Sequence, residues 1–254
     1  MYKYTNDFLL MLQFLTRIPI NINLNCEKDN FRKGAVFLPI VGFIVGGLQW
    51  IIYYLLNKVL PNNIIAVIMV ITAVMVTGAL HIDGLGDTCD GFFAFKGKDR
   101  IIEIMKDSRI GSFGAIAVSA DLLMKVMAIS YILDSSFAAA VIAAAVMGRF
   151  SIIFISYISK PAKSNGSGNL FIGNMNRIIV LISGLLSFGI NIVLLGLKIS
   201  LIIFSAVVIL TFLFKKYCEN KIGGATGDIL GANNELVEIL TLIIVVSTIR
   251  HNLF

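Results

Sequence analysis

The stretch 35-AVFLPIVGFIVGGLQWIIYYLL-56 contains 22 residues without a single charge. A helix needs about 20 apolar residues to cross the ~30 Å hydrocarbon core of a bilayer, so this stretch is long enough to be a membrane span. A second run, 64-IIAVIMVITAVMVTGAL-80, is nearly as long, and a third begins after Gly111. Repeated runs of this kind predict an all-α, polytopic integral membrane protein built as a helical bundle.

The composition of the whole chain favours the same class. Of the 254 residues, 57% are hydrophobic and only 14% are charged, whereas roughly 25% of residues are charged in an average soluble domain. The apolar runs are separated by short polar loops without a linker, so we expect one domain over residues 1–254. No internal repeat is visible, which counts against transporter folds built from inverted repeats.

Seven membrane spans are expected from the apolar runs. The first twenty residues are expected to form an interfacial helix, because they carry Asp7 and Arg17 and no signal-peptide cleavage site. The spans are predicted at residues 34–56, 63–80, 112–134, 136–158, 178–196, 199–214 and 229–249.

The distribution of basic residues predicts the orientation of these spans. Alternate loops place fourteen Lys and Arg residues on one side of the membrane and three, Lys58, Lys198 and Arg250, on the other. The positive-inside rule assigns the first side to the cytoplasm. The formal net charge of +6 is therefore explained by topology rather than by nucleic-acid binding.

One predicted cytoplasmic loop begins with the acidic segment 80-LHIDGLGDTCDGF-92. Asp83, Asp87 and Asp90 are spaced i, i+4 and i+7, so on a helix that continues the preceding span their carboxylates would project from one face. Like charges at this spacing repel each other, and a hard divalent cation with oxygen ligands, Mg²⁺ or Mn²⁺, would neutralise them. The alternative is a solvated helix end at the membrane surface.

A second acidic segment, 223-GGATGDILGANNELVEIL-240, leads into the last predicted span. Asp228 and Glu235 are seven residues apart and share a helix face. Two acidic helices at one membrane depth could hold two metal ions about 3.5–4 Å apart, an arrangement used in phosphoryl transfer. Glu235 could instead be a charge near the interface, although an ionisable residue within a span is functional by default.

The segment 100-RIIEIMKDSRIGSFGA-115 is predicted to form a short amphipathic helix, a basic loop and the start of a span. Arg109 and the backbone N–H groups of the helix that begins near Gly111 would suit a phosphate, and Lys106 would add a point charge. Both basic residues could equally be topology determinants.

Several further polar groups have more than one interpretation. Asp121 and Lys125 are spaced i, i+4 and could pair with each other, while Arg149 should find a carboxylate or face water. His81 could act as a base beside the acidic helix or be a hydrogen-bonded structural residue. The loop 160-KPAKSNGSGNLFIGNMNR-177 could be a connector or a cover over a substrate.

Taken together, the motifs resemble the cobalamin synthase family, the adenosylcobinamide-GDP ribazoletransferases or cobalamin 5′-phosphate synthases. The pattern H-[IL]-D-G-L-x-D-T-x-D-G followed by M-[KR]-D-S-R-[IL]-G is specific. At its first variable position this chain has Gly86, where alanine is expected in the family. The matching segments run in order through almost the whole chain: 14-FLTRIPI-20, 34-GAVFLPIVGFIVG-46, 78-GALHIDGLGDTCDG-91, 105-MKDSRIGSFG-114, 168-GNLFIG-173 and 223-GGATGDILGANNE-235.

The resemblance implies a Mg²⁺-dependent membrane transferase of the EC 2.7.8 class that acts in the last steps of cobalamin biosynthesis. A hydroxyl of α-ribazole, or of its 5′-phosphate, would attack the phosphorus attached to cobinamide in adenosylcobinamide-GDP. GMP would leave, and adenosylcobalamin or its 5′-phosphate would be released. The corrinoid nucleotide and ribazole would be the partners, in the cytoplasmic (inner) membrane of a prokaryote, with the active site facing the cytoplasm.

The resemblance also implies roles for individual residues. Metal binding, by one or two Mg²⁺ ions that Mn²⁺ could replace, is expected of Asp83, Asp87, Asp90, Asp228 and Glu235. Contacts with the phosphates or the substrate are expected of Lys106, Ser108, Arg109 and Asn169, the last in a loop, 168–173, that would cover the corrinoid or nucleotide. Catalytic roles are expected of Asp87, Asp107 and His81, the last two as candidate acceptors of the ribazole proton.

Other classes fit the sequence less well. A lipid-forming CDP-alcohol phosphotransferase would share 87-DTCDGFFA-94, but Phe95 stands where its motif has arginine. A cation or corrinoid transporter would place its acids near the bilayer midplane, on broken helices, whereas these acids are expected at cytoplasmic ends of spans. The small-residue spacing in 42-GFIVGG-47 is compatible with a homo-oligomer or with an internal helix contact.

Overall fold

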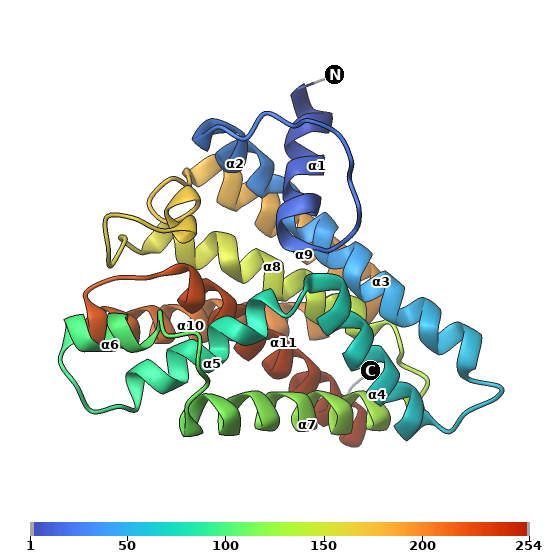
Figure 1. Cartoon of the computed structure of the whole chain (residues 1–254). Coiled ribbons are helices and arrows are strands. Elements are labelled where there is room, and N and C mark those ends of the chain that lie inside the picture. The colour runs from blue at the N-terminus through green and yellow to red at the C-terminus, as the bar shows by residue number, and fades with distance from the viewer. Residues whose placement is uncertain (1–2, 253–254) are drawn as a thin grey trace.

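The computed structural model describes residues 3–252, and within this range every regular element is a helix. The prediction of an all-α protein is therefore confirmed. In chain order (Figure 1) the elements are α1 (Lys3–Leu15), α2 (Lys28–Gly34), the 3₁₀ helix η1 (Ala35–Phe37), α3 (Leu38–Leu56), α4 (Asn62–Thr77), α5 (Leu80–Phe92), α6 (Lys98–Ile104), α7 (Ser112–Asp134), α8 (Ala140–Ile158), the 3₁₀ helix η2 (Ser167–Leu170), α9 (Arg177–Leu195), α10 (Leu197–Ile222) and α11 (Gly227–Arg250).

The number of spans agrees with the prediction. Among the described residues, six helices are long and apolar enough to cross a membrane, and α4 with α5 makes a seventh if this bent pair counts as one span. Large apolar side chains point outward, with Leu185 72% and Val193 86% exposed. Apolar exposure on this scale is unusual for a soluble monomer, and it suits a surface that faces lipid.

Helix α10 extends eight residues beyond the predicted end of its span at residue 214. The apolar run ends there, but Lys215 and Glu219 form an i, i+4 ion pair of 2.7 Å that supports further helical turns. Gly223, with φ of +76°, then ends the helix. Hydropathy located the apolar part of this helix and missed its polar extension.

The span predicted at residues 63–80 is bent. Helix α4 ends at Thr77, and the next two residues, Gly78 and Ala79, have φ of +62° and +60°. Two successive residues in the left-handed region interrupt the helix, and α5 leaves at 89° to α4. The expectation that the acidic segment continues the preceding span was wrong, although the segment does form a helix of its own.

The N-terminal region packs against this bend. The backbone N–H of Arg17 donates a 2.6 Å hydrogen bond to Val76 O. A Cβ atom on Gly78 would lie 2.2 Å from Arg17 Nε, and its φ of +62° is one that side chains rarely adopt, so glycine is favoured at this position. The segment that follows α1 therefore helps to fix the direction in which α5 leaves α4.

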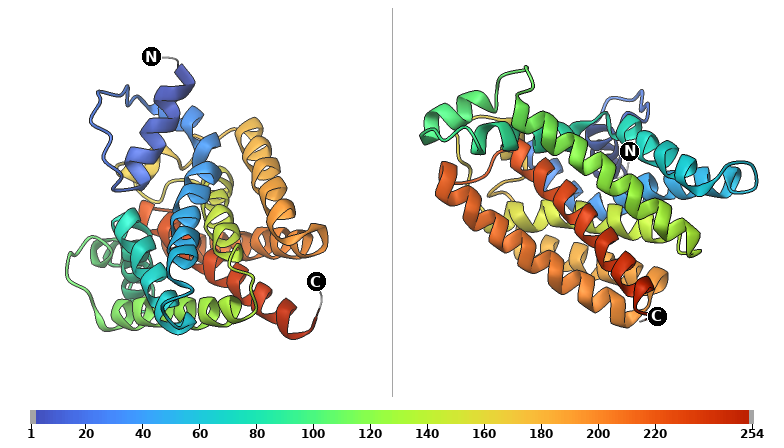
Figure 2. Two further views of the ribbon diagram at one scale, coloured as in Figure 1. Left: turned by 90° about the vertical axis from the view of Figure 1, so that its right-hand side faces the viewer. Right: turned by 90° about the horizontal axis from the view of Figure 1, so that it is seen from below.

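Helix α8 lies at the centre of the bundle (Figure 1), and 83% of its most apolar stretch of 18 residues is buried. Helix α3 approaches it closely through two glycines: a Cβ on Gly42 would lie 2.5 Å from Ala145 O, and a Cβ on Gly46 would lie 2.6 Å from Ile142 Cα. The small-residue spacing in residues 42–47 is thus used for a contact inside the molecule. In Figure 2, α11 runs beside α7 and α10 along the bundle, in agreement with the contacts between these helices.

Candidate functional site

The site is organised by the crossing of α5 over the start of α11. A Cβ on Gly84 would lie 2.6 Å from Asp228 O, and a Cβ on Gly231 would lie 2.9 Å from His81 O. Two glycines, one on each helix, therefore allow the two backbones to approach. This close crossing brings the first turn of α11 next to the acidic face of α5.

Four aspartates, which we call the aspartate cluster, come together at this crossing. They are Asp83, Asp87 and Asp90 on α5 and Asp228 on α11. The negative charges of Asp83, Asp228 and Asp90 all act on Asp87. The structure therefore assembles four of the five side chains that the sequence had assigned to metal binding.

Asp90 differs from the other members because its carboxylate already has partners. Its two oxygens accept hydrogen bonds from the backbone N–H groups of Gly111 and Gly114, at 2.7 and 2.8 Å. A carboxylate in this position caps the N-terminus of α7 and is favoured by the helix dipole. Asp90 thus ties the loop before α7 to α5.

Asp228 is oriented by Thr226, the N-cap residue of α11. The Thr226 hydroxyl donates to Asp228 Oδ2 at 3.1 Å and accepts from the N–H of Ile229. The positive charge of Lys163, from the loop after α8, also acts on Asp228. Thr226 was not among the predicted site residues, although a threonine just before a predicted helix is a recognised N-cap signal.

The carboxylates of Asp83 and Asp87 have no hydrogen bond or ion pair within residues 3–252. Asp83 is exposed and Asp87 is half-buried. No three Asp, Glu, His or Cys side chains of the described chain are arranged to hold a metal ion by themselves. Mg²⁺ is usually held by one or two carboxylates together with substrate phosphates and water, so this donor set fits an ion whose coordination the substrate completes.

The loop between α6 and α7, residues 105–111, carries the predicted phosphate ligands, and we call it the basic loop. Lys106, Ser108 and Arg109 are exposed. Arg109 Nε and Nη2 donate to the two carboxylate oxygens of Asp107 at 3.0 and 2.7 Å. These hydrogen bonds lower the pKa of Asp107 to about 2.

A pocket opens beside the aspartate cluster. Asp83 and Asp228 line one part of it together with His81, and Phe14 and Phe171 line another part. His81 is 4% exposed, and its Nε2 has no hydrogen-bond partner in the described part of the chain. We call this cavity the Phe14–Phe171 pocket.

The loop after α8 forms part of the pocket and is firmly attached to the start of α11. Ala225 exchanges backbone hydrogen bonds of 2.9 Å with the 160–162 segment, and a Cβ on Gly168 would lie 2.5 Å from Gly227 N. The Asn169 side chain donates to Lys163 O and Ser164 O at 3.0 and 2.9 Å. Asn169 therefore holds the loop in shape, whereas its neighbours Ser167 and Gly168 line the pocket.

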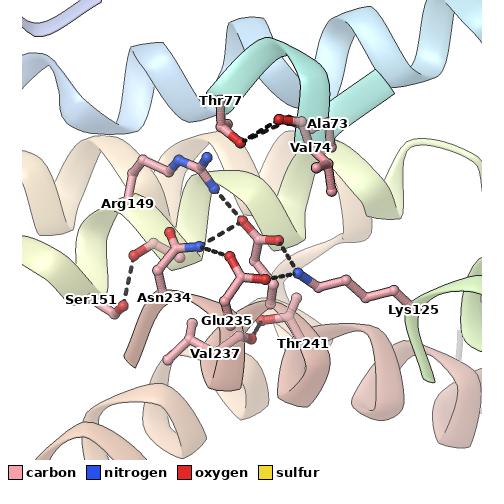
Figure 3. Close-up of polar contacts among 12 residues, drawn as sticks. Ala73, Val74, Thr77, Lys125, Arg149, Ser151, Asn234, Glu235, Val237 and Thr241 are labelled. Carbon is pink, nitrogen blue, oxygen red and sulfur yellow. Dashed lines mark hydrogen bonds and ion pairs between the residues drawn. The ribbon is translucent and has the colours of Figure 1, made fainter. Parts of the chain in front are cut away.

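A second group of charges, which we call the ion-pair cluster, is buried between α7, α8 and α11 (Figure 3). Lys125 contacts Asp121 at 3.3 Å and Glu238 at 3.0 Å, and it also pairs with Glu235. The cluster comprises Asp121, Lys125, Arg149, Glu235 and Glu238.

Two predictions are confirmed in the ion-pair cluster. Asp121 and Lys125 pair with each other, and Arg149 finds a carboxylate, that of Glu238. Figure 3 shows Lys125 and Arg149 approaching the acids from opposite sides. Asn234 lies on the side of Arg149, and its Nδ2 donates to Glu238 Oε1 at 3.1 Å.

Glu235 belongs to the ion-pair cluster and not to the aspartate cluster. Seven residues of helix separate it from Asp228, which is about 10 Å along the helix axis, and Lys125 neutralises it. The structure does not bring this fifth predicted metal ligand to the other four. The contact with Lys125 joins residues 110 positions apart, and no local pattern in the sequence indicates it.

Comparison with known proteins agrees with this arrangement of motifs. The sequence pattern described as cobalamin-5-phosphate synthase matches residues 7–246. A protein of Clostridium botulinum (strain Okra) named adenosylcobinamide-GDP ribazoletransferase is 50% identical over 96% of this chain and 98% of its own. Proteins of the same name from Clostridium tetani and Clostridium kluyveri (strain ATCC 8527) are 47% and 49% identical, over 98% and 96% of this chain and 100% and 97% of their own.

No solved structure matches the chain. The matched region includes the aspartate cluster, the basic loop, the Phe14–Phe171 pocket and the ion-pair cluster. The extent of the match and the identity to these relatives lead to one conclusion: the chain belongs to the cobalamin-5-phosphate synthase family.

Proposed function

We propose that this protein transfers the cobinamide phosphate of adenosylcobinamide-GDP to a hydroxyl of α-ribazole or of its 5′-phosphate. The observation that carries the proposal is the group of unpaired aspartates beside a pocket, in a chain of this family. The products would be adenosylcobalamin, or its 5′-phosphate, and GMP. The relatives' name states the same transfer.

The reaction exchanges the phosphoanhydride bond of the pyrophosphate for a phosphate ester bond. The acceptor oxygen forms a bond to the phosphorus that carries cobinamide, the bond from this phosphorus to the GMP oxygen breaks, and the hydroxyl proton is released. His81 is better placed than Asp107 to accept that proton, because it lines the pocket with Asp83 and its Nε2 is unpartnered. Asp107 is instead engaged by Arg109.

The protein's main task in such a reaction is to position the reactants and stabilise charge. Asp83, Asp87 and Asp228 carry the carboxylates available to Mg²⁺, or Mn²⁺; because no three acids of the described chain surround one position, one or two of them would bind the ion and the substrate phosphates would complete its coordination. The ion would neutralise negative charge on the pyrophosphate. Asp90 would keep α5 and the basic loop together, and Arg109 and Lys106 on that loop would contact phosphate. Glu235 is left out of this metal site because Lys125 neutralises it.

We also propose that the site faces the cytoplasm from the cytoplasmic membrane. Three of the predicted cytoplasmic segments, at residues 81–111, 159–177 and 215–228, contribute residues to the aspartate cluster or the Phe14–Phe171 pocket. The fourteen basic residues of the predicted cytoplasmic side include those of these three loops. A reagent that labels cysteine but does not cross membranes would test this: a cysteine introduced at exposed Ser108 should be labelled in inverted vesicles and protected in intact cells.

The function is tested by GMP release from the purified protein in detergent or liposomes. Adenosylcobinamide-GDP, α-ribazole and Mg²⁺ should give GMP only when all three are present, and EDTA should stop its formation. If the folded protein binds or transports adenosylcobinamide-GDP but leaves its pyrophosphate intact, the protein is instead a carrier.

A further inference from the structure

The Phe14–Phe171 pocket has two chemically different parts. Its apolar part is formed by Phe14 and Leu15 at the end of α1, Ile152 of α8 and Phe171. The Phe14 and Phe171 rings lie with centroids 5.7 Å apart and planes inclined at 45°. Aromatic walls of this kind favour a flat, apolar ring, which gains edge-to-face or stacked contacts in addition to its burial.

The polar part of the pocket contains the reacting end of the site. Asp83 and Asp228, two of the proposed metal ligands, line it together with His81. Because the buried His81 Nε2 lacks a partner within residues 3–252, an occupant with a hydroxyl or ring nitrogen would supply a missing hydrogen bond. An occupant that is apolar at one end and carries hydroxyls at the other matches both parts.

On the basis of the proposed function, we infer that this pocket is the acceptor subsite: Phe14 and Phe171 bind the aromatic base of the ribazole, and its ribose lies toward Asp83, Asp228 and His81. The attacking hydroxyl is then delivered to the aspartate cluster from the side of α1. The corrinoid nucleotide would approach from the opposite side, where the basic loop carries Arg109.

The chemistry of the walls distinguishes the ribazole base from the other ring systems of the reaction. Guanine carries several hydrogen-bond donors and acceptors on its edge, and Phe14, Leu15, Ile152 and Phe171 offer none to match them. The two phenylalanines contact each other, with centroids 5.7 Å apart, so they form a single apolar wall against which a nucleoside base can pack, whereas the corrin ring is far larger than such a base. A base with an apolar edge leaves no polar atom unsatisfied there.

The chain offers a matched control for this inference. Phe31 packs against both pocket rings, with centroids 5.3 Å from Phe14 and 5.8 Å from Phe171, but it is not among the residues that line the pocket. Phe31→Leu therefore perturbs the same aromatic packing without removing a wall. Phe171→Leu and Phe14→Leu remove a wall while keeping an apolar side chain.

The experiment measures binding of α-ribazole alone to the purified protein by calorimetry, and the KM of each substrate by GMP release. Phe171→Leu and Phe14→Leu should each weaken α-ribazole binding and raise its KM about 3- to 10-fold, with the KM for adenosylcobinamide-GDP unchanged. Phe31→Leu should change neither constant. The inference is overturned if Phe31→Leu weakens ribazole binding as much as Phe171→Leu does, or if the wall variants raise the KM for the corrinoid substrate instead.

The result also separates this inference from the proposed function. If Phe14→Leu and Phe171→Leu both release GMP with an unchanged KM for α-ribazole, the protein is a transferase but this pocket is not its acceptor subsite. Binding of α-ribazole that depends on Phe171, without GMP release under any condition, would retain the subsite and reject the transfer reaction. Phe14 is only partly buried, so Phe14→Leu remains informative if Phe171→Leu fails to fold.

Discussion

The aspartate cluster and the ion-pair cluster both depend on acids of α11, and they differ in how those acids are neutralised. Asp228 faces Asp83 and Asp87, which have no ion pair in the described chain. Glu235, two turns further along α11, pairs with Lys125, and Glu238 pairs with Lys125 and Arg149.

The difference shows which acids are available for chemistry. A buried charge is tolerated when it is paired, and in the ion-pair cluster two cations, Lys125 and Arg149, offset most of the charge of its three acids. The aspartate cluster brings like charges together without a matching set of cations, and it is complete only when a ligand supplies positive charge. Position within an apolar span did not indicate that Glu235 is paired with Lys125.

The sharpest test of this comparison is Asp87→Asn. Loss of a residue that only orients a metal ligand typically costs 10–100-fold in activity, so loss of a ligand should lower the rate of GMP release by more than about 100-fold. The thermal unfolding midpoint should stay the same or rise, because one of several like charges is removed. Asp134→Asn, at an exposed hydrogen bond to Asn62, serves as the control. Full activity of Asp87→Asn at ordinary Mg²⁺ concentrations would remove the aspartate cluster from the metal site.

The opposite behaviour is expected of Lys125→Met. It leaves Asp121 and Glu235 buried without their cation, and breaking a buried ion pair in this way costs about 3–5 kcal/mol of folding free energy. The unfolding midpoint in detergent should fall sharply, while the molecules that remain folded keep a kcat within a few-fold of the original. Lys215→Met, which removes a more exposed i, i+4 pair, should cost only about 0.3–0.5 kcal/mol. A stable but inactive Lys125→Met protein would give the ion-pair cluster a part in catalysis.

A smaller effect is expected where α5 crosses α11. Gly84→Ala would place a Cβ atom 2.6 Å from Asp228 O, and relieving such a clash costs about 1–3 kcal/mol. Because the two helices carry the aspartate cluster, GMP release should fall as well. Gly86→Ala is the matched control on the same helix, since its Cβ would meet Val118 at an ordinary 3.4 Å, and it should be tolerated. Equal effects of the two substitutions would mean that helix propensity, and not the crossing, is responsible.

The smallest effect is expected in the basic loop. Arg109→Lys should lower GMP release about 10-fold, because an ammonium group cannot replace a bidentate phosphate contact. Lys106→Arg should change it less than about 3-fold, since Lys106 contributes only a point charge. Steady-state rates with the corrinoid substrate varied would measure both. If the two substitutions cause equal, small losses, these residues act as determinants of membrane topology.

Local patterns in the sequence predicted the features that depend on near neighbours. Apolar runs located the spans, the i, i+4 spacing indicated the pair of Asp121 with Lys125, and the spacing of the α5 aspartates placed them on one face. At position 86, where glycine stands in place of the expected alanine, a Cβ atom would meet Val118 at an ordinary contact distance of 3.4 Å.

Features that join distant parts of the chain could not be predicted in this way. The 89° bend after α4 depends on Ala79 adopting φ of +60°, a conformation for which alanine gives no signal. The neutralisation of Glu235 by Lys125 is a tertiary contact, as is the meeting of Phe14 with Phe171. These contacts decide which acids are free and where the acceptor subsite lies.

The Phe14–Phe171 pocket is built from residues near the two ends of the chain, with Phe14 in the first helix region and Asp228 at the start of the last helix. During synthesis, the ribosome therefore produces one wall of the pocket at the outset and the other only after every remaining helix has been made. A chain that ends before α11 lacks Asp228, and with it one member of the aspartate cluster and part of the lining of the pocket.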